Sequence, residues 1–187
     1  ALMVPPGLAA PAADWPQWAE DALSWGREAS ISRDLLAVPE KTVTRGMAAQ
    51  LLYEAAGRPA VSGACPFSDV SGEYSSAVTW AAAEGCLSGA GDGTFAPARP
   101  VTRQEFAAIL WRQAGSPDTA AQGLSQFRDA GSVAEWAREP VLWCLQAGVM
   151  SGRGADQLAP TGTITTAEAL VMLEQVHALP DVSQLRT

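Results

Sequence analysis

The feature of this sequence that most constrains its fold is an internal repeat with a period of about 60 residues. A β-branched residue followed by Thr and then by Arg or Thr occurs three times, at Val43–Arg45, Val101–Arg103 and Ile164–Thr166. Three further series keep the same spacing. They are a tryptophan (Trp25, Trp80 and Trp143), a Phe-x-Asp segment (Phe67–Asp69 and Phe127–Asp129) and a Gly-rich segment (Gly85–Gly89 and Gly148–Gly152). Four series with one shared period indicate three related units.

Each unit is expected to contain two helices, because its apolar residues recur at helical spacing. In the second unit, Phe106, Ile109 and Leu110 fall on one face of a helix that Thr102 and Glu105 open as a capping box. A two-helix unit of this length cannot bury its apolar face alone. The three units are therefore expected to pack together into a mainly α-helical fold.

The charge pattern excludes nucleic acid as a ligand. The chain is 48% hydrophobic and 17% charged, with a formal net charge of −8, whereas a phosphate-binding surface needs clustered Lys and Arg. Its basic residues are Arg except for Lys41. Arg offers a planar fork that suits a carboxylate, although a high-GC genome, which favours Arg and Ala codons, would explain the same bias. No apolar run approaches the roughly 20 residues of a membrane span, so no membrane insertion is expected.

The three cysteines do not indicate a metal site, because no Cys-x-x-Cys pair is present. Cys86 and Cys144 lie in apolar stretches and are expected to be small core residues. Cys65 lies between two units and is either free or disulfide-bonded. We expect neither a cofactor nor a metal; Asp92 and Gly93 are better explained as a turn than as a calcium site, because few carboxylates cluster there.

The second unit resembles the S-layer homology pattern almost throughout. The matching segments are Phe67–Val70, Trp80-Ala81, Gly85–Gly89, Gly91–Pro97 and Val101–Glu105. The resemblance is good in the third unit and weaker in the first, where Ser30–Lys41 replaces the Gly-Asp-Gly-x-Phe-x-Pro loop. We therefore divide the chain into a flexible lead-in, three S-layer-homology-like repeats and a tail, at residues 1–13, 14–60, 61–120, 121–180 and 181–187.

This resemblance implies a fold and a function. The family's fold is a pseudo-threefold spindle, in which one helix from each unit joins a shared central bundle and grooves lie between neighbouring units. The family's function is noncovalent attachment of secreted proteins to a secondary cell-wall polysaccharide, often one with ketal-linked pyruvate. It implies an extracellular location at the cell wall or S-layer of a bacterium, and fusion to another extracellular domain.

The candidate ligand-binding residues are those that suit an acidic sugar. Arg45 and Arg103 each follow a capping threonine, so they lie in the first turn of a helix, where unpaired N–H groups and the dipole favour an anion; the alternative is a solvated surface charge. Gly-rich loops let backbone N–H groups approach a ligand closely. The full set of candidates is Arg45, Arg103, Ser88, Gly89, Gly91, Trp80, Trp143, Ser151 and Gly152.

Several of these residues also have a structural explanation. Trp80 and Trp143 lie on apolar helix faces that suit the core, although one edge of each ring could meet a sugar. The loop serines either donate to the ligand or shape their loops. Asp69 and Asp129 are expected to cap helices or to form turns.

The three helix starts are not equivalent. Thr166 stands where the other units have Arg45 and Arg103, and it cannot form a charged fork with a carboxylate. A charge-assisted hydrogen bond contributes about 1.5–3 kcal/mol. We therefore expect Arg103, whose unit keeps the full Gly-rich loop, to contribute most to binding, Arg45 less and Thr166 almost nothing.

The sequence contains no recognisable catalytic motif, and we expect no enzymatic activity. It has no nucleophile elbow, zinc-protease motif or phosphate loop, and the single histidine, His177, falls near the end of the last helix, where the dipole favours it at the surface. The main alternative is an S-layer-homology-like structural or protein-interaction module that has lost polymer binding. A wall-active glycosidase that uses two carboxylates is the least favoured alternative.

Overall fold

The computed structural model describes residues 14–119 and 123–180, so the predicted lead-in at 1–13 and tail at 181–187 lie outside it. The helices of this part are α1 (Glu20–Glu28), α2 (Arg33–Leu36), α3 (Arg45–Ala55), α4 (Ser75–Ala83), α5 (Arg103–Gln113), α6 (Arg138–Gln146) and α7 (Thr166–His177). Among the described residues the extended contacts are isolated bridges rather than a sheet. The predicted mainly α-helical fold is confirmed.

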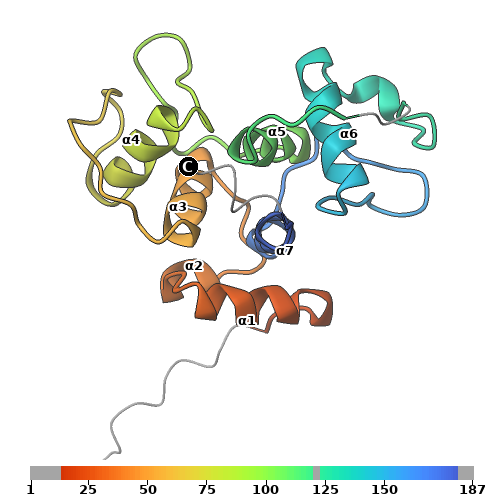
Figure 1. The fold of residues 1–187 in the computed structure, drawn as a ribbon, viewed down its shortest axis with the longest axis horizontal. Helices are drawn as coiled ribbons and strands as arrows, with labels where there is room; N and C mark the ends of the chain where they lie inside the picture. Colours follow the sequence, from red (N-terminus) through yellow and green to blue (C-terminus); the bar gives the residue numbers. More distant parts are fainter. Residues whose placement is uncertain (1–13, 120–122, 181–187) are drawn as a thin grey trace, which may run out of the picture.

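The helices pair across the boundaries of the repeats. Helix α3 of the first unit packs against α4 of the second, α5 against α6, and α7 against α1, so the third pair joins the two ends of the described chain. Helices α3, α5 and α7 lie toward the centre of the molecule, with α4, α6 and α1 outside them (Figure 1). The two helices of each predicted unit therefore belong to different pairs.

The starts of the three central helices are joined to neighbouring loops by the same backbone contacts. The first two N–H groups of each helix donate to two carbonyls of a loop: those of α3 to Arg99 and Pro97, those of α5 to Gly162 and Pro160, and those of α7 to Lys41 and Pro39. The segment Ser30–Lys41 of the first unit thus supplies the accepting carbonyls that a Gly-rich loop supplies in the other two units. The three junctions form a closed ring; the pseudo-threefold spindle and the repeat boundaries stay predictions.

The predicted helix caps are present, with one difference. The threonines before α3, α5 and α7 each accept a hydrogen bond from the N–H three residues further on. Glu168 completes the capping box of α7. At α5 the box is half formed, because Glu105 binds Arg99 at 2.9 Å instead of returning to Thr102.

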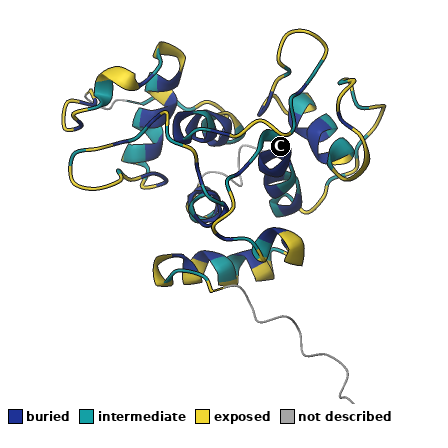
Figure 2. Cartoon of the chain, turned by 180° about the vertical axis from the view of Figure 1, so that it is seen from behind, coloured by how far each residue is buried: buried dark blue, intermediate teal, exposed yellow. Residues whose placement is uncertain are grey.

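One hydrophobic core runs through all three units. Phe106 and Leu110 are fully buried and Ile109 nearly so, as their helical spacing predicts. Burial is concentrated on the inward faces of the helices, and the outer loops are exposed (Figure 2). Within the described residues no helix has the length and apolarity that a membrane crossing would need.

The cysteines follow their predicted environments. Cys86 and Cys144 are buried in the core, and burial raises the pKa of the Cys144 thiol. Cys65 is a half-buried free thiol, which resolves the alternative left open by its position between units.

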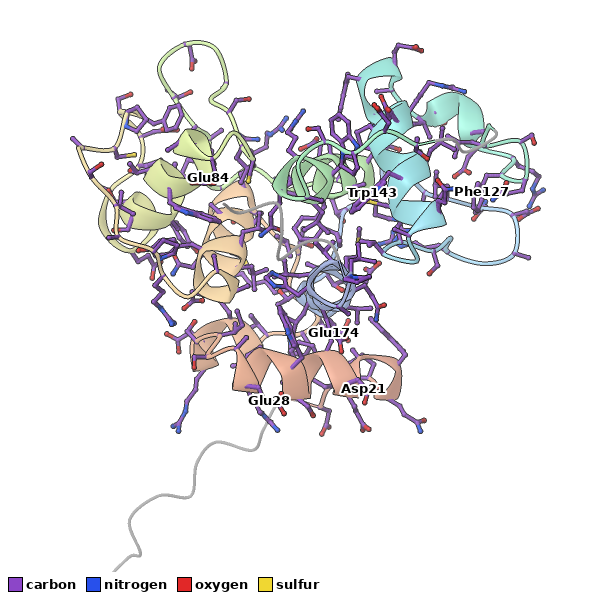
Figure 3. All side chains as sticks on the ribbon, in the orientation of Figure 1. Asp21, Glu28, Glu84, Phe127, Trp143 and Glu174 are labelled. Atoms are coloured by element: carbon purple, nitrogen blue, oxygen red, sulfur yellow. The ribbon has the colours of Figure 1, made fainter. Side chains whose placement is uncertain are left out.

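The contact between α1 and α7 is close. A Cβ on Gly26 would lie 3.2 Å from the side chains of both Leu170 and Leu36, so glycine allows this approach. His177 packs against Trp25 with ring centroids 5.2 Å apart, which corrects its prediction as a surface residue. Glu174 lies on the same helix, above α1 in Figure 3, and burial raises its pKa.

Replacement of Leu170 by Ala should destabilise the whole molecule. Leu170 is fully buried on α7 beside α1, and a Leu→Ala change at such a site costs about 2–5 kcal/mol. Because the units share one core, urea denaturation followed by tryptophan fluorescence should give a single transition at a lower midpoint. Trp18→Ala, at an exposed position, is the control and should change the unfolding free energy by no more than about 0.5 kcal/mol. Two separate transitions in Leu170→Ala would show that the units unfold independently.

Candidate ligand-binding grooves

Two grooves lie where an arginine begins a central helix. The first, here called the Arg45 groove, has a volume of about 270 Å³ and is lined by Arg45, Leu87, Ser88, Arg99, Glu105, Ala108, Ile109, Arg112 and Trp136. The second, the Arg103 groove, has a volume of about 230 Å³ and is lined by Trp18, Arg103, Val149, Met150, Ser151, Gly152, Arg153, Glu168, Val171 and Met172. Both are smaller than pockets for drug-sized ligands, which measure roughly 300–1,000 Å³. Each therefore suits a group of about the size of one sugar.

The two grooves are built from equivalent parts of the repeat. Each combines the arginine that starts one central helix, the serine of the Gly-rich segment, one face of the next central helix and a tryptophan before an outer helix. Ile109, predicted as a core position, and Met172 at the equivalent position of α7 also form groove walls. Because these parts come from different units, neither groove could form within a single repeat.

The groove tryptophans are Trp18 and Trp136, which sequence reasoning did not select. Their exposed fractions are 61% and 54%. They lie in the 3-10 turns Gln17–Ala19 and Glu135–Ala137, and these turns break the helical phase that would have placed them beside the core tryptophans seven residues later. The signal was present in the sequence, because Trp-Ala precedes the outer helix in both units.

The tryptophans chosen from the sequence lie away from the grooves. Trp80 is buried in the core, in contact with Tyr53 at 5.8 Å between ring centroids. Trp143 is half-buried against the core in the lobe of α6 (Figure 3). Neither lines a groove, so the structural explanation fits Trp80 well.

Arg45 is held by backbone carbonyls and an aromatic ring. Its Nε donates to the Phe95 carbonyl at 2.8 Å, one Nη donates to the Ser88 carbonyl, and the guanidinium lies 4.4 Å from the centroid of the Phe95 ring. Burial and the charge of Arg99 lower its pKa, but a guanidinium remains charged at any physiological pH. Among the described residues no carboxylate forms an ion pair with it.

Arg103 is held by two carbonyls and a carboxylate. Its Nε donates to Leu158 at 3.0 Å, and its two Nη atoms donate to the Glu168 carboxylate at 3.2 Å and to the Ser151 carbonyl at 2.5 Å. Only 5% of the residue is exposed. Glu168 also binds Arg153 at 3.0 Å, so one carboxylate lies between two arginines.

The helix starts themselves offer no free N–H groups to an anion, which corrects the prediction made from the sequence. In α3 and α5 the first two N–H groups donate to loop carbonyls and the third to the capping threonine. Charge recognition in the grooves must therefore come from side chains or from the Gly-rich loops, and not from the helix starts.

The predicted loop glycines shape the loops in different ways. A Cβ on Gly89 would lie 2.5 Å from the Phe67 ring, and one on Gly152 would lie 2.7 Å from the carbonyl of Gln157. Gly91 has a φ of +98° at the loop tip. Of these glycines only Gly152 lines a groove, whereas the serines of both loops do so and accept from the groove arginines through their carbonyls.

Asp69 and Asp129 fasten the loops rather than capping helices. Asp69 accepts from the N–H groups of Phe95 and Ala96, both at 2.8 Å. Asp129 accepts in the same way from Leu158 and Ala159, at 2.9 and 2.8 Å. The expected helix-capping role is therefore wrong, because the side-chain partners lie in a distant loop, whereas the expected turn is present at both residues. The backbone N–H groups lower the pKa of both carboxyls.

The third helix start lacks the arginine, the glutamate and the tryptophan of the other two grooves. Thr166 is fully buried, and its hydroxyl donates to the Lys41 carbonyl at 3.0 Å. In sequence register, Met47 and Glu73 replace the glutamate and the tryptophan of the grooves. Asp92 forms the expected turn by accepting from the Thr94 N–H at 3.0 Å, and the described residues contain no cluster of three or more His, Cys, Asp or Glu that could hold a metal ion.

Comparison with known proteins identifies the repeated unit. Residues 66–107 and 126–170 match the model of the S-layer homology domain, so the second and third units belong to this family. The chain is 31% identical to the Surface-layer 125 kDa protein of Lysinibacillus sphaericus over 159 residues, which are 79% of this chain and 13% of that protein.

Two further relatives are named as an enzyme and as a cell-surface glycoprotein. An amylopullulanase of Thermoanaerobacterium thermosulfurigenes is 30% identical over 140 residues, which are 72% of this chain and 8% of the relative. Cell surface glycoprotein 1 of Acetivibrio thermocellus is 26% identical over 149 residues, which are 73% and 6% of the respective chains. The chain thus spans no more than 13% of the length of these three relatives. The family and the surface-protein relatives indicate an extracellular location at the cell wall or S-layer.

The carboxylates of Asp69 and Asp129 should make the unfolding free energy fall at acid pH. Because the pKa of Asp69 and of Asp129 is lower in the folded chain than the ordinary value near 3.9, their contribution is complete above about pH 4 and is lost as pH falls through the folded pKa. Urea denaturation between pH 4 and pH 2 should therefore show a falling unfolding free energy. The Asp69→Asn, Asp129→Asn double variant should show a shallower fall.

Glu174, whose pKa is raised, affects the unfolding free energy at a higher pH than Asp69 and Asp129 do. Its contribution changes between the ordinary value near 4.3 and the raised folded value, so Glu174 does not contribute to the slope below pH 4. Asp92 does contribute there, because hydrogen bonds from Thr94 also lower its pKa. An unchanged slope in the double variant would assign the acid sensitivity to other groups.

Proposed function

We propose that this chain anchors a secreted bacterial protein to the cell wall by binding an acidic secondary cell-wall polysaccharide through the Arg45 and Arg103 grooves. The observation that carries the proposal is that each groove combines arginines with an exposed tryptophan. A guanidinium can bind a carboxylate or hydroxyl through parallel hydrogen bonds. An indole offers a broad apolar face and one N–H donor, which together suit a sugar ring.

The relatives support an attachment role. They include a surface-layer protein and an amylopullulanase, which share with this chain a segment that is a small part of each. A segment common to proteins of such different names suits a shared location better than a shared reaction. On this proposal the chain is part of, or carries, another extracellular domain, and has no catalytic activity of its own.

We also propose that residues 14–60 are a third, divergent S-layer homology repeat and that the three repeats form a pseudo-threefold spindle. The support is the equivalent backbone junction at α7, where Lys41 and Pro39 accept from the first N–H groups of the helix. On this proposal the first repeat completes the ring, while the helix start at Thr166 binds no acidic group.

The tryptophans should be required for polymer binding. Purified wall polymer should bind the chain in calorimetry, and chemical removal of the pyruvate ketal should weaken binding. Trp136→Ala and Trp18→Ala should each weaken it about tenfold, which corresponds to about 1.4 kcal/mol. Trp25→Ala, which alters a half-buried residue away from both grooves, is the control for general effects of removing an indole.

The same experiment separates the alternatives. A folded chain that does not bind wall polymer would support a structural or protein-interaction module, for which the exposed tryptophans would be contact residues. Release of reducing sugar from the polymer would instead support a wall-active hydrolase.

Salt should weaken polymer binding only modestly, despite the net charge of −8. Exposed charges are screened beyond about 8 Å at physiological ionic strength, so the arginines in a groove outweigh distant carboxylates. The dissociation constant measured at 50 and 300 mM salt should therefore change by less than about tenfold. Loss of binding between low and physiological salt would indicate diffuse electrostatic attraction in place of recognition in the grooves.

A further inference from the structure

We infer that the two grooves take different parts of the polymer: the Arg45 groove binds the acidic group, and the Arg103 groove binds an uncharged sugar face. This inference rests on the proposed function and specifies which groove holds the charge. It reverses the order expected from the sequence, in which Arg103 contributes most.

The guanidinium of Arg45 is open to an incoming carboxylate. Its Nε and one Nη donate to the Phe95 and Ser88 carbonyls, and no described residue accepts from the other Nη. The two nearby carboxylates are engaged elsewhere: Glu105 binds Arg99 at 2.9 Å, and Asp69 accepts from the N–H groups of Phe95 and Ala96. A ligand carboxylate would meet a charged donor that has no anionic partner.

The guanidinium of Arg103 already has protein acceptors. All three of its nitrogens donate hydrogen bonds, and one acceptor is the carboxylate of Glu168. Glu168 is held in place by Arg153 at 3.0 Å and by the Thr165 N–H at 3.3 Å. A ligand carboxylate would therefore have to displace a protein carboxylate that already occupies its place.

The other lining residues also make the Arg45 groove more basic than the Arg103 groove. The Arg45 groove adds Arg99 and Arg112 at its rim, so its lining carries three arginines and one glutamate. The Arg103 groove carries two arginines and one glutamate, and its walls add Val149, Met150, Val171 and Met172. Apolar walls beside an exposed tryptophan suit the CH face or an acetyl group of a neutral sugar.

The test uses two probes that differ only in charge: a methyl hexoside with a ketal-linked pyruvate, and the methyl ester of the same compound. In calorimetry the unaltered chain should bind the acid about ten- to a hundredfold more tightly than the ester, as one charge-assisted hydrogen bond implies. Arg45→Gln should abolish this preference, so that the affinity for the acid falls to that for the ester.

Arg112→Glu provides a variant that does not touch the backbone contacts of Arg45. Arg112 is exposed at the rim of the Arg45 groove, so the change should weaken acid binding more than ester binding. The matched control is Gln175→Glu, which places the same charge at the equivalent, exposed position of α7. It should leave both affinities unchanged.

Glu168→Gln should add acid selectivity to the other groove. Gln also completes a capping box, but it does not neutralise Arg103 and Arg153, so a second site that prefers the acid should appear. If the unaltered chain binds two acids with equal affinity, or if Gln175→Glu weakens acid binding as much as Arg112→Glu does, the inference is wrong. Equal binding of acid and ester would overturn this inference alone, whereas binding of neither probe would overturn the proposed function as well.

Discussion

The fold depends on the backbone junction at the start of each central helix. The first two N–H groups of an α-helix have no partner within the helix, and here they donate to carbonyls of a neighbouring loop at α3, α5 and α7. Each junction satisfies the helix start and also fixes the loop that passes over it. Because the junction at α7 uses Lys41 and Pro39 of the first unit, the ring closes only when all three units are present.

This arrangement explains why the grooves lie where they do. A loop fastened to a helix start also brings its Gly-x-x-Ser-Gly segment to the arginine of that helix, and the serine carbonyl accepts from the guanidinium. Asp69 and Asp129 then hold the other side of each loop through two backbone N–H groups. The walls are completed by the next central helix and by a tryptophan from a turn. The chemistry of each groove is therefore assembled from several units, while the rigidity comes from backbone hydrogen bonds.

The environment of one carboxylate distinguishes two grooves that look alike in sequence. Glu105 and Glu168 occupy the same position of their helices, yet Glu105 binds Arg99 and Glu168 binds both Arg103 and Arg153. The difference follows from where each loop carries its second arginine, since Arg99 lies just before its helix and Arg153 lies in the Gly-rich loop. A buried arginine paired with its own carboxylate supports the fold, whereas an arginine held by carbonyls keeps its charge available to a ligand.

The sequence by itself determined the period of the repeat, the helical class, the core face at Phe106, Ile109 and Leu110, and the position of two groove arginines. These depend on local periodicity and on residues that recur with the repeat. It did not determine which tryptophans reach a groove, because a single 3-10 turn before the helix moved Trp18 and Trp136 out of phase with the core. Nor did it determine the partners of the aspartates and the arginines, which lie in loops far along the chain. Only the tertiary structure decides these contacts, because they join helices and loops of different units, and spacing within one unit carries no information about them.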